Sequence, residues 1–219
     1  YIEDGRIQVF AIDSIDYETL FGQGDPRARI CRHEAWINPI MEEAVPHFSY
    51  INTQANGWEV RFLVAGLSLG ALHAATLFFR YPDVFDALMS LSGIYTNEYC
   101  FGGYHDDLTY MNSPQQFVAG MPKDHPYIRK YNSGRIVLCV GRGAWENETL
   151  ESTSAFAQVL KDTGIGAWVD YWGDDSRHDW DWWVVQAASL LPNILDYCKV
   201  YGAACCLLVA LSNFTALNR

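Results

Sequence analysis

The feature that most constrains the fold is a serine flanked by glycines, at the point where an apolar run changes into a helical pattern. The segment Gly66-Leu67-Ser68-Leu69-Gly70 follows the apolar run 60–65 and precedes the helix-like run 71–80. A strand, a sharp turn and a helix in this order hold a serine on a strained turn with its hydroxyl exposed. The glycines avoid collisions with the neighbouring backbone, and the helix N-terminus favours negative charge. Ser68 is therefore a candidate nucleophile, although a buried serine in a tight turn would give the same five residues.

Strand-like and helix-like runs alternate along the chain. Strands are predicted at 6–13, 60–65, 84–93, 135–141 and 167–172, and helices at 33–50, 71–80 and 149–163. Pro39 and Pro46 interrupt the helical spacing of the first helix. The alternation predicts an α/β fold, with a mostly parallel sheet and helices on both faces. The chemistry should then lie at the carboxyl ends of the strands.

Length and hydrophobic content indicate a single α/β domain. The chain has 219 residues, of which 50% are hydrophobic, enough for one substantial core. We expect this domain over 1–198, followed by an apolar C-terminal segment at 199–219. The irregular, aromatic stretch 94–133 is a lid-like insertion or, equally, a structural excursion.

Composition argues against several classes of partner and cofactor. A net charge of −11 disfavours a nucleic-acid partner, which clustered cations would have to bind. The six cysteines have neither zinc-site nor disulfide-framework spacing, and no HExxH or paired metal-ligand pattern occurs. We therefore expect no metal and no cofactor. The first residues do not read as a signal peptide, so the expected location is the cytoplasm.

A serine nucleophile needs a base within hydrogen-bond reach and a carboxylate that orients the base. In folds with this strand–turn–helix motif the three residues follow in the order serine, acid, histidine. His178, in the loop after the last predicted strand, fits the base, and Glu146, after the strand 135–141, fits the acid. Glu148 and Asp175 remain alternatives for the acid.

The reaction also needs donors for an oxyanion and a pocket for the substrate. The backbone N–H of Leu69, directly after the nucleophile, is one predicted oxyanion donor, and the source of a second donor is open. Aromatic residues supply apolar area with a polar handle, which suits a pocket wall. The candidate substrate pocket comprises Tyr95, Tyr104, Trp145 and Trp180.

Five ordered motifs together resemble the putative esterase family of α/β-hydrolases, which includes esterase D-like enzymes and mycolyltransferases. The motifs are the serine segment 66–71, the segments 79–86, 91–95 and 141–146, and the histidine segment 171–180. The resemblance runs from about residue 5 to about residue 195. The resemblance implies serine-dependent hydrolysis of small-molecule carboxylic esters through an acyl-enzyme, with Ser68, His178 and Glu146 as the triad. Acyl transfer on the same fold, or a non-catalytic binding protein with a truncated hydrolase fold, are the alternatives.

The chain departs from this family's pattern at both ends. Family members usually have further strands at the N-terminus, ending in the loop that donates the first oxyanion N–H, and here the sequence starts after them. Residues 200–218 form an uncharged tail, where such enzymes normally finish with a helix. We expect this tail to be a buried helix or an interface segment of a homo-oligomer rather than a membrane span, filling the space of the absent strands.

Overall fold

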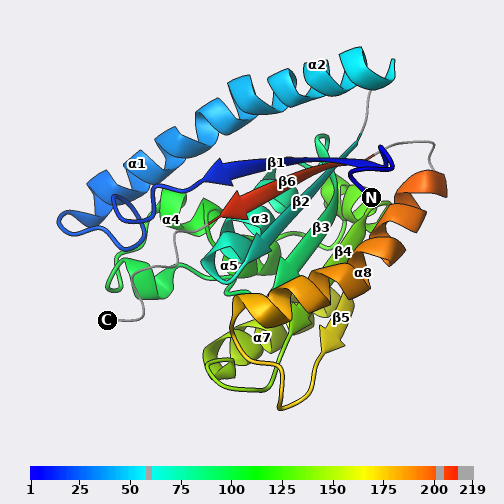
Figure 1. Ribbon diagram of the computed structural model, residues 1–219. Helices are drawn as coiled ribbons and strands as arrows, with labels where there is room; N and C mark the ends of the chain where they lie inside the picture. Colours follow the sequence, from blue (N-terminus) through cyan, green and yellow to red (C-terminus); the bar gives the residue numbers. More distant parts are fainter. Residues whose placement is uncertain (58–60, 201–204, 212–219) are drawn as a thin grey trace.

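The computed structural model describes the backbone at residues 1–57, 61–200 and 205–211, and a six-stranded sheet forms its centre (Figure 1). In spatial order the strands are β1 (Ile7–Asp13), β6 (Cys205–Leu211), β2 (Arg61–Leu67), β3 (Phe85–Leu91), β4 (Arg135–Val140) and β5 (Trp168–Tyr171). Each neighbouring pair runs parallel. The prediction of an α/β fold with a mostly parallel sheet is confirmed.

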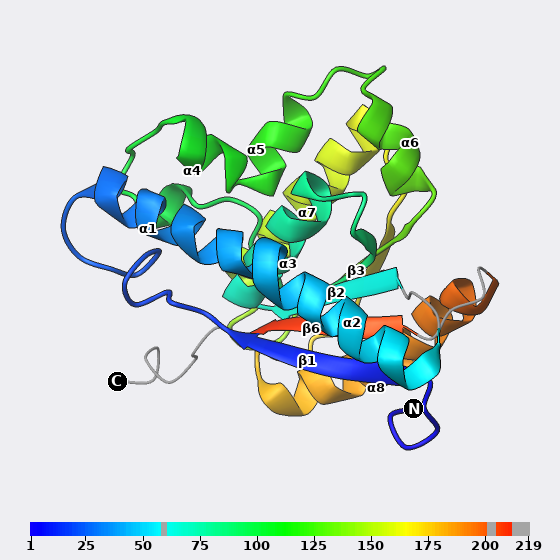
Figure 2. The same ribbon diagram turned by 90° about the horizontal axis from the view of Figure 1, so that it is seen from above.

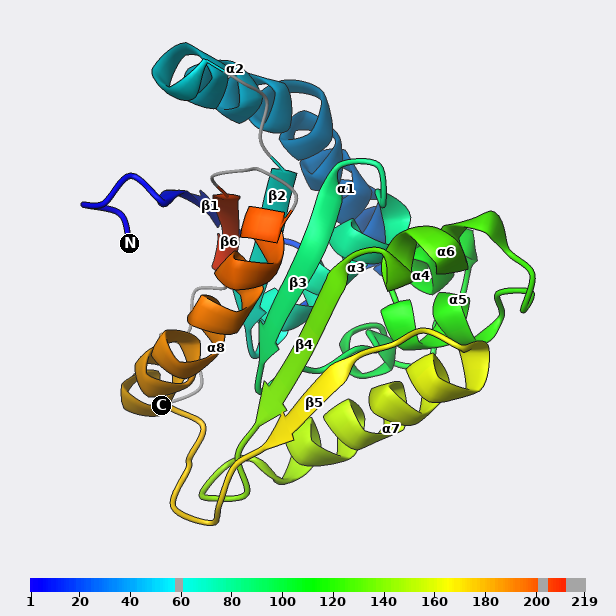
Figure 3. The same ribbon diagram turned by 90° about the vertical axis from the view of Figure 1, so that its right-hand side faces the viewer.

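Helices cover both faces of this sheet, as Figure 3 shows for α7 (Asn147–Thr163) and α8 (Trp180–Val200). Alternate residues of one strand face opposite layers. In β2, for example, Val64 joins the cluster with α3 (Leu69–Arg80) and α7, whereas Leu63 joins the cluster with α8. Because helices cover both sides, the strands are apolar at nearly every position rather than at every second one.

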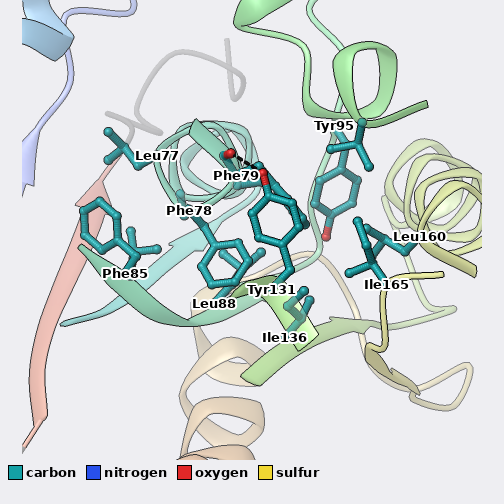
Figure 4. Packing of buried hydrophobic residues seen from close by; sticks show 14 of the residues in the cluster. Leu77, Phe78, Phe79, Phe85, Leu88, Tyr95, Tyr131, Ile136, Leu160 and Ile165 are labelled. Atoms are coloured by element: carbon teal, nitrogen blue, oxygen red, sulfur yellow. Dashed lines mark hydrogen bonds between the residues drawn. The ribbon is translucent and has the colours of Figure 1, made fainter. Parts of the chain in front are cut away.

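The larger core cluster lies on the α3 side of the sheet and is rich in aromatic rings (Figure 4). Phe79 packs edge-to-face against both Tyr131 and Phe156. The buried hydroxyl of Tyr131 donates to the backbone carbonyl of Phe79 at 2.6 Å. This bond satisfies the one polar atom of the ring, so the tyrosine can be buried without an unpaired donor.

The two prolines of the first helical run are accommodated without a break. The run comprises α1 (Pro26–Pro39), a π-helical turn η1 (Ile40–Ala44) and α2 (Val45–Asn56). Each proline removes one backbone donor, and the π turn lies between Pro39 at the end of α1 and Pro46 in the first turn of α2. The prolines therefore mark the π turn, and the helix continues through it.

The insertion 94–133 forms a series of short helices: η2 (Glu98–Cys100), α4 (Asp107–Met111), α5 (Pro114–Ala119) and α6 (Pro126–Asn132). Helix α4 contacts α1, and α5 contacts α3 and α7 (Figure 2). Helix α6 contacts β4. The insertion thus runs along the helices of one face toward the edge where β4 begins. Its role as a lid stays a prediction.

The prediction of a helix in the C-terminal tail is wrong for the part that the structure describes. Cys205–Leu211 is the strand β6, which pairs with β1 on one side and β2 on the other. A short apolar run is compatible with either a buried helix or a strand covered on both faces, and periodicity cannot distinguish them. Residues 201–204 and 212–219 of the tail lie outside the described residues.

Candidate active site

Ser68 lies on the turn between β2 and α3, at the carboxyl edge of the sheet. Its backbone has φ 54° and ψ −120°, and φ values in this positive range are uncommon outside glycine. A Cβ at Gly66 would lie 2.0 Å from the carbonyl oxygen of Gly70, so strand and helix approach too closely for any side chain. The predicted strained turn is therefore present around Ser68.

His178 reaches Ser68 from the loop after β5. Its Nε2 lies 2.9 Å from Ser68 Oγ, and its Nδ1 lies 3.2 Å from Glu146 Oε2. Backbone bonds join this loop to the one after β4: His178 N–H donates to Ala144 O at 3.0 Å, and Gly143 N–H donates to Ser176 O at 2.8 Å. These bonds between the two loops therefore fix the position of His178 relative to Glu146.

Glu146 is fully buried between β4 and α7, and its carboxylate accepts several hydrogen bonds. Burial raises the pKa of Glu146, but hydrogen bonds from His178, Ser92 and Thr149 outweigh it and hold the pKa below its usual range. The ionised carboxylate only accepts hydrogen bonds, so Nδ1 of the neutral imidazole carries the proton and Nε2 can accept one from Ser68. This tautomer is the one that a general base requires.

The alternative acids lie away from the imidazole contacts. Glu148 is exposed in the first turn of α7, and Asp175 is exposed in the loop before His178. Among the three acidic candidates, Glu146 is the one with a described contact to His178. A glutamate in the first turn of a helix is favoured by the helix dipole, which accounts for Glu148.

The four predicted pocket residues occupy different surroundings. Tyr95 is fully buried, stacks on Phe156 and shares a 2.6 Å hydrogen bond with Ser90, so it is a core residue and cannot line an open pocket. Tyr104 is half-buried and donates to Asp106. Trp145 is exposed on the loop that carries Glu146, and Trp180 is exposed at the first residue of α8, directly after the loop that carries His178. The prediction of Tyr95 as a pocket residue is wrong, because an aromatic stretch in the sequence does not reveal how deeply each ring is buried.

Three residues around Glu146 and His178 are not among the predicted site residues. Ser92 and Thr149 donate to the Glu146 carboxylate, at 2.6 Å and 2.5 Å, and the indole Nε1 of Trp183 donates to Ser92 Oγ at 3.0 Å. Ser92 follows β3 directly, so its place at the carboxyl edge was a usable signal. Nothing in the spacing of Trp183 indicates this contact.

Leu69 is the first residue of α3, directly after the nucleophile. The first N–H groups of a helix have no partner within the helix, so this donor can serve an oxyanion at Ser68. The second donor that the sequence analysis left open has no candidate among the described contacts of the site.

A second group of polar side chains is buried beside α3. His73 Nε2 lies 2.9 Å from Asp16 Oδ1, and Ser14 donates to the other carboxylate oxygen at 2.6 Å. The ring of His33 stacks on that of His73, with 5.2 Å between centroids. Burial and the neighbouring His73 lower the pKa of His33 to about 3, so His33 is neutral at pH 7.

In the part of the chain that the structure describes, no group of histidine, cysteine and carboxylate side chains is arranged to hold a metal ion. None of the helices in these described residues has the length and apolar character needed to cross a bilayer.

Comparisons with known proteins identify the family. A family model described as "Putative esterase" matches residues 1–194. The chain belongs to this esterase family. The match ends within α8, so the strand β6 of this esterase-family chain lies beyond the matched residues. No curated protein sequence matches the chain significantly.

Several solved structures share the fold of this esterase-family chain. An S-formylglutathione hydrolase from Agrobacterium tumefaciens superposes with a TM-score of 0.56 at 13% identity, over 74% of this chain and 57% of that one. MPT51 (FbpC1) of Mycobacterium tuberculosis gives 0.51 at 16% identity, over 73% and 68%. The S-formylglutathione hydrolase FrmB of Staphylococcus aureus gives 0.50 at 11% identity, over 87% and 81%. The chain thus spans less than two thirds of the Agrobacterium protein, and at these identities the likeness concerns the fold alone.

Proposed function

We propose that this protein is a serine carboxylic ester hydrolase that works through an acyl-enzyme. The observation that carries the proposal is the line of hydrogen-bond contacts from Ser68 through His178 to the buried Glu146. A serine hydroxyl is a weak nucleophile at neutral pH, and a neutral imidazole at hydrogen-bond distance supplies the base it lacks. Family membership supports the same reaction class.

In the first half of the proposed reaction, Ser68 Oγ attacks the carbonyl carbon of the ester while its proton passes to His178 Nε2. The backbone N–H of Leu69 donates to the oxyanion of the tetrahedral intermediate. When the carbon–oxygen bond to the alcohol breaks, His178 returns the proton to the departing oxygen. The acyl group then remains bound to Ser68 as an ester.

In the second half, water attacks the acyl-enzyme and gives its proton to His178. Collapse of the second tetrahedral intermediate breaks the bond to Ser68 Oγ, which recovers the proton, and the carboxylic acid leaves. Throughout, Glu146 remains ionised and stabilises the imidazolium that forms twice in each cycle. The lowered pKa of Glu146 fits this role.

The substrate in this proposal is a small-molecule ester. Trp145, on the loop of Glu146, and Trp180, at the start of α8, are exposed and are proposed to form part of the substrate-binding surface. Aromatic faces of this kind bind flat apolar or ring-shaped groups.

The test combines covalent labelling with turnover. A fluorophosphonate should label the protein once, at Ser68, and Ser68→Ala should abolish labelling and lower kcat for p-nitrophenyl acetate by about 10⁴-fold or more. Ser154→Ala, which removes an exposed helical hydroxyl, is the control and should leave both unchanged. Mass spectrometry of the labelled peptide identifies the site.

Other outcomes would favour other functions. A folded protein without any labelling would contradict the proposal and favour a non-catalytic binding protein. If Ser68 is labelled but turnover with an added alcohol gives mainly the ester of that alcohol, the proposed reaction would be acyl transfer instead of hydrolysis.

A further inference from the structure

Ser92 occupies a position where the backbone favours glycine. It follows β3 directly, has φ 47° and is fully buried. Its own N–H donates to Cys139 O at 2.7 Å, which ties the end of β3 to β4. A left-handed conformation costs a non-glycine residue roughly 1–2 kcal/mol, so the side chain must contribute something that glycine would not.

The direction of the hydrogen bonds at Ser92 follows from its two partners. The indole Nε1–H of Trp183 can only donate, so Ser92 Oγ accepts this bond at 3.0 Å. The hydroxyl proton is then available for the carboxylate of Glu146, which accepts it at Oε1 over 2.6 Å. The indole therefore fixes the orientation of the hydroxyl, and the hydroxyl fixes one oxygen of the carboxylate.

The two carboxylate oxygens of Glu146 have different partners. Oε2 faces His178 Nδ1 and also accepts from Thr149, whereas the described contacts give Oε1 a single donor, Ser92. A carboxylate held at both oxygens cannot rotate about its terminal bond without losing a buried hydrogen bond. Trp183 also contacts the imidazole directly, with ring centroids 4.9 Å apart and planes at 84°.

We infer that Ser92 is a positioning residue, which holds Glu146 so that one carboxylate oxygen faces His178. This inference rests on the proposed function, because it assigns Ser92 a role in activating Ser68. Ser92 acts through Glu146, so its contribution should require the carboxylate. A role in general stability would not depend on Glu146.

The experiment is a double-mutant cycle on the rate at which a fluorophosphonate labels Ser68. The rate is measured for the unaltered full chain, for Ser92→Gly, for Glu146→Gln and for the double variant. Glycine tolerates positive φ, so Ser92→Gly removes the hydroxyl without adding strain. We expect Ser92→Gly to slow labelling about tenfold in the unaltered protein and less than about twofold in the Glu146→Gln background. Equal factors in both backgrounds, or no slowing at all, would overturn the inference.

Ser90→Ala is the matched control. Like Ser92, Ser90 is fully buried, but it lies within β3 and its hydroxyl bonds to Tyr95 rather than to Glu146. The Ser90→Ala variant should have a lower Tm than the unaltered protein, but the same labelling rate. If Ser90→Ala slowed the labelling of Ser68 as strongly as Ser92→Gly does, the loss of any buried hydroxyl near the site would have the same effect. That result would also overturn the inference. Absence of labelling in the unaltered protein would contradict the proposed function itself, whereas normal labelling in Ser92→Gly contradicts only the role of Ser92.

Discussion

Trp145 combines two properties that folding alone does not favour. Its backbone has φ 67°, and its side chain is 86% exposed. The three non-glycine residues with positive φ in the described part of the chain are Ser68, Ser92 and Trp145, and all follow strand ends at the candidate active site. Strain of this kind tends to persist where function needs it. The exposed indole is therefore better explained by substrate contact than by packing.

We expect Trp145→Gly to preserve stability and weaken substrate binding. Relief of the left-handed strain offsets the added freedom of glycine, so the free energy of unfolding should change by less than about 1 kcal/mol. KM for an aryl ester should rise several-fold while kcat is kept, as steady-state kinetics can determine. The control is Tyr99→Ala, which removes another side chain that is 86% exposed. An unchanged KM in Trp145→Gly would argue against the predicted substrate contact.

Among single residues, those that lie at fixed places relative to strands are predictable from the sequence. Ser68, Glu146 and His178 were predicted because their chain order and strand-end positions follow the hydrolase pattern. Tyr95 and Trp183 could not be sorted in the same way, since both are aromatic residues near site segments and only tertiary packing determines their depth. Tyr95 packs into the core, and Trp183 contacts the imidazole.

At the element scale, two loops hold the site together and leave little space between them. A Cβ at Gly141 would lie 2.1 Å from Ser176 O, and one at Gly143 would lie 2.6 Å from the same atom. The loop after β4 carries Glu146 and the loop after β5 carries His178, so the spacing of the loops sets the distance between acid and base. Both glycines were part of the motif read from the sequence, but the reason for them is this close approach.

Gly141→Ala should therefore separate the two loops. Overpacking of a tight contact costs about 1–3 kcal/mol, and the displaced histidine loop should lower kcat/KM at least about tenfold. Thermal unfolding and p-nitrophenyl acetate kinetics measure the two effects. In the control Gly166→Ala, the added methyl would meet Asn132 Oδ1 at an ordinary 3.5 Å, and neither quantity should change appreciably. Wild-type kinetics in Gly141→Ala would contradict this account of the loops.

The boundaries of helices and strands are predictable where hydrophobic periodicity is clear. The predictions are wrong where tertiary geometry overrides local preference. The strands feeding the site and α7 follow the predicted runs closely. The prolines suggested a broken helix, whereas a π turn carries the helix past them. For the tail, the sequence predicts a buried helix or an interface segment, because an apolar run has no period that reveals a strand between two others.

At the scale of the whole molecule, the buried cluster beside α3 makes stability depend on pH. The unfolded chain protonates His33 near pH 6.5, whereas the folded protein keeps it neutral down to a pKa of about 3. Between these values the unfolded state binds more protons, so the free energy of unfolding falls as the pH is lowered through this window. The buried Asp16 and Glu146 and the half-buried Glu34 have lowered pKa values, so their contribution starts to be lost only as the pH falls toward their ordinary pKa values of 3.8 and 4.5.

We expect the free energy of unfolding to be about 2 kcal/mol lower at pH 5 than at pH 7.5, with His33 as the main cause. His33→Phe keeps an aromatic ring against His73 and should remove most of this difference. Urea denaturation followed by tryptophan fluorescence at both pH values provides the measurement. His47→Phe replaces an exposed histidine of the same helical run and serves as the control. Full pH dependence in His33→Phe would assign the effect to other groups.

The place of β6 has a consequence for the order of events during synthesis. β1 and β2 are both made long before β6, yet each pairs with it. Cys205, the first residue of β6, lies opposite Ile7 of β1 and Arg61 of β2. During translation the β6-facing edge of β1 stays unpaired until about 190 further residues have been made, and that of β2 until about 140 have been made. Contacts so distant along the chain form slowly, and open strand edges invite pairing with other chains. A cell that makes this protein quickly should therefore rely on chaperones to keep the nascent sheet from aggregating.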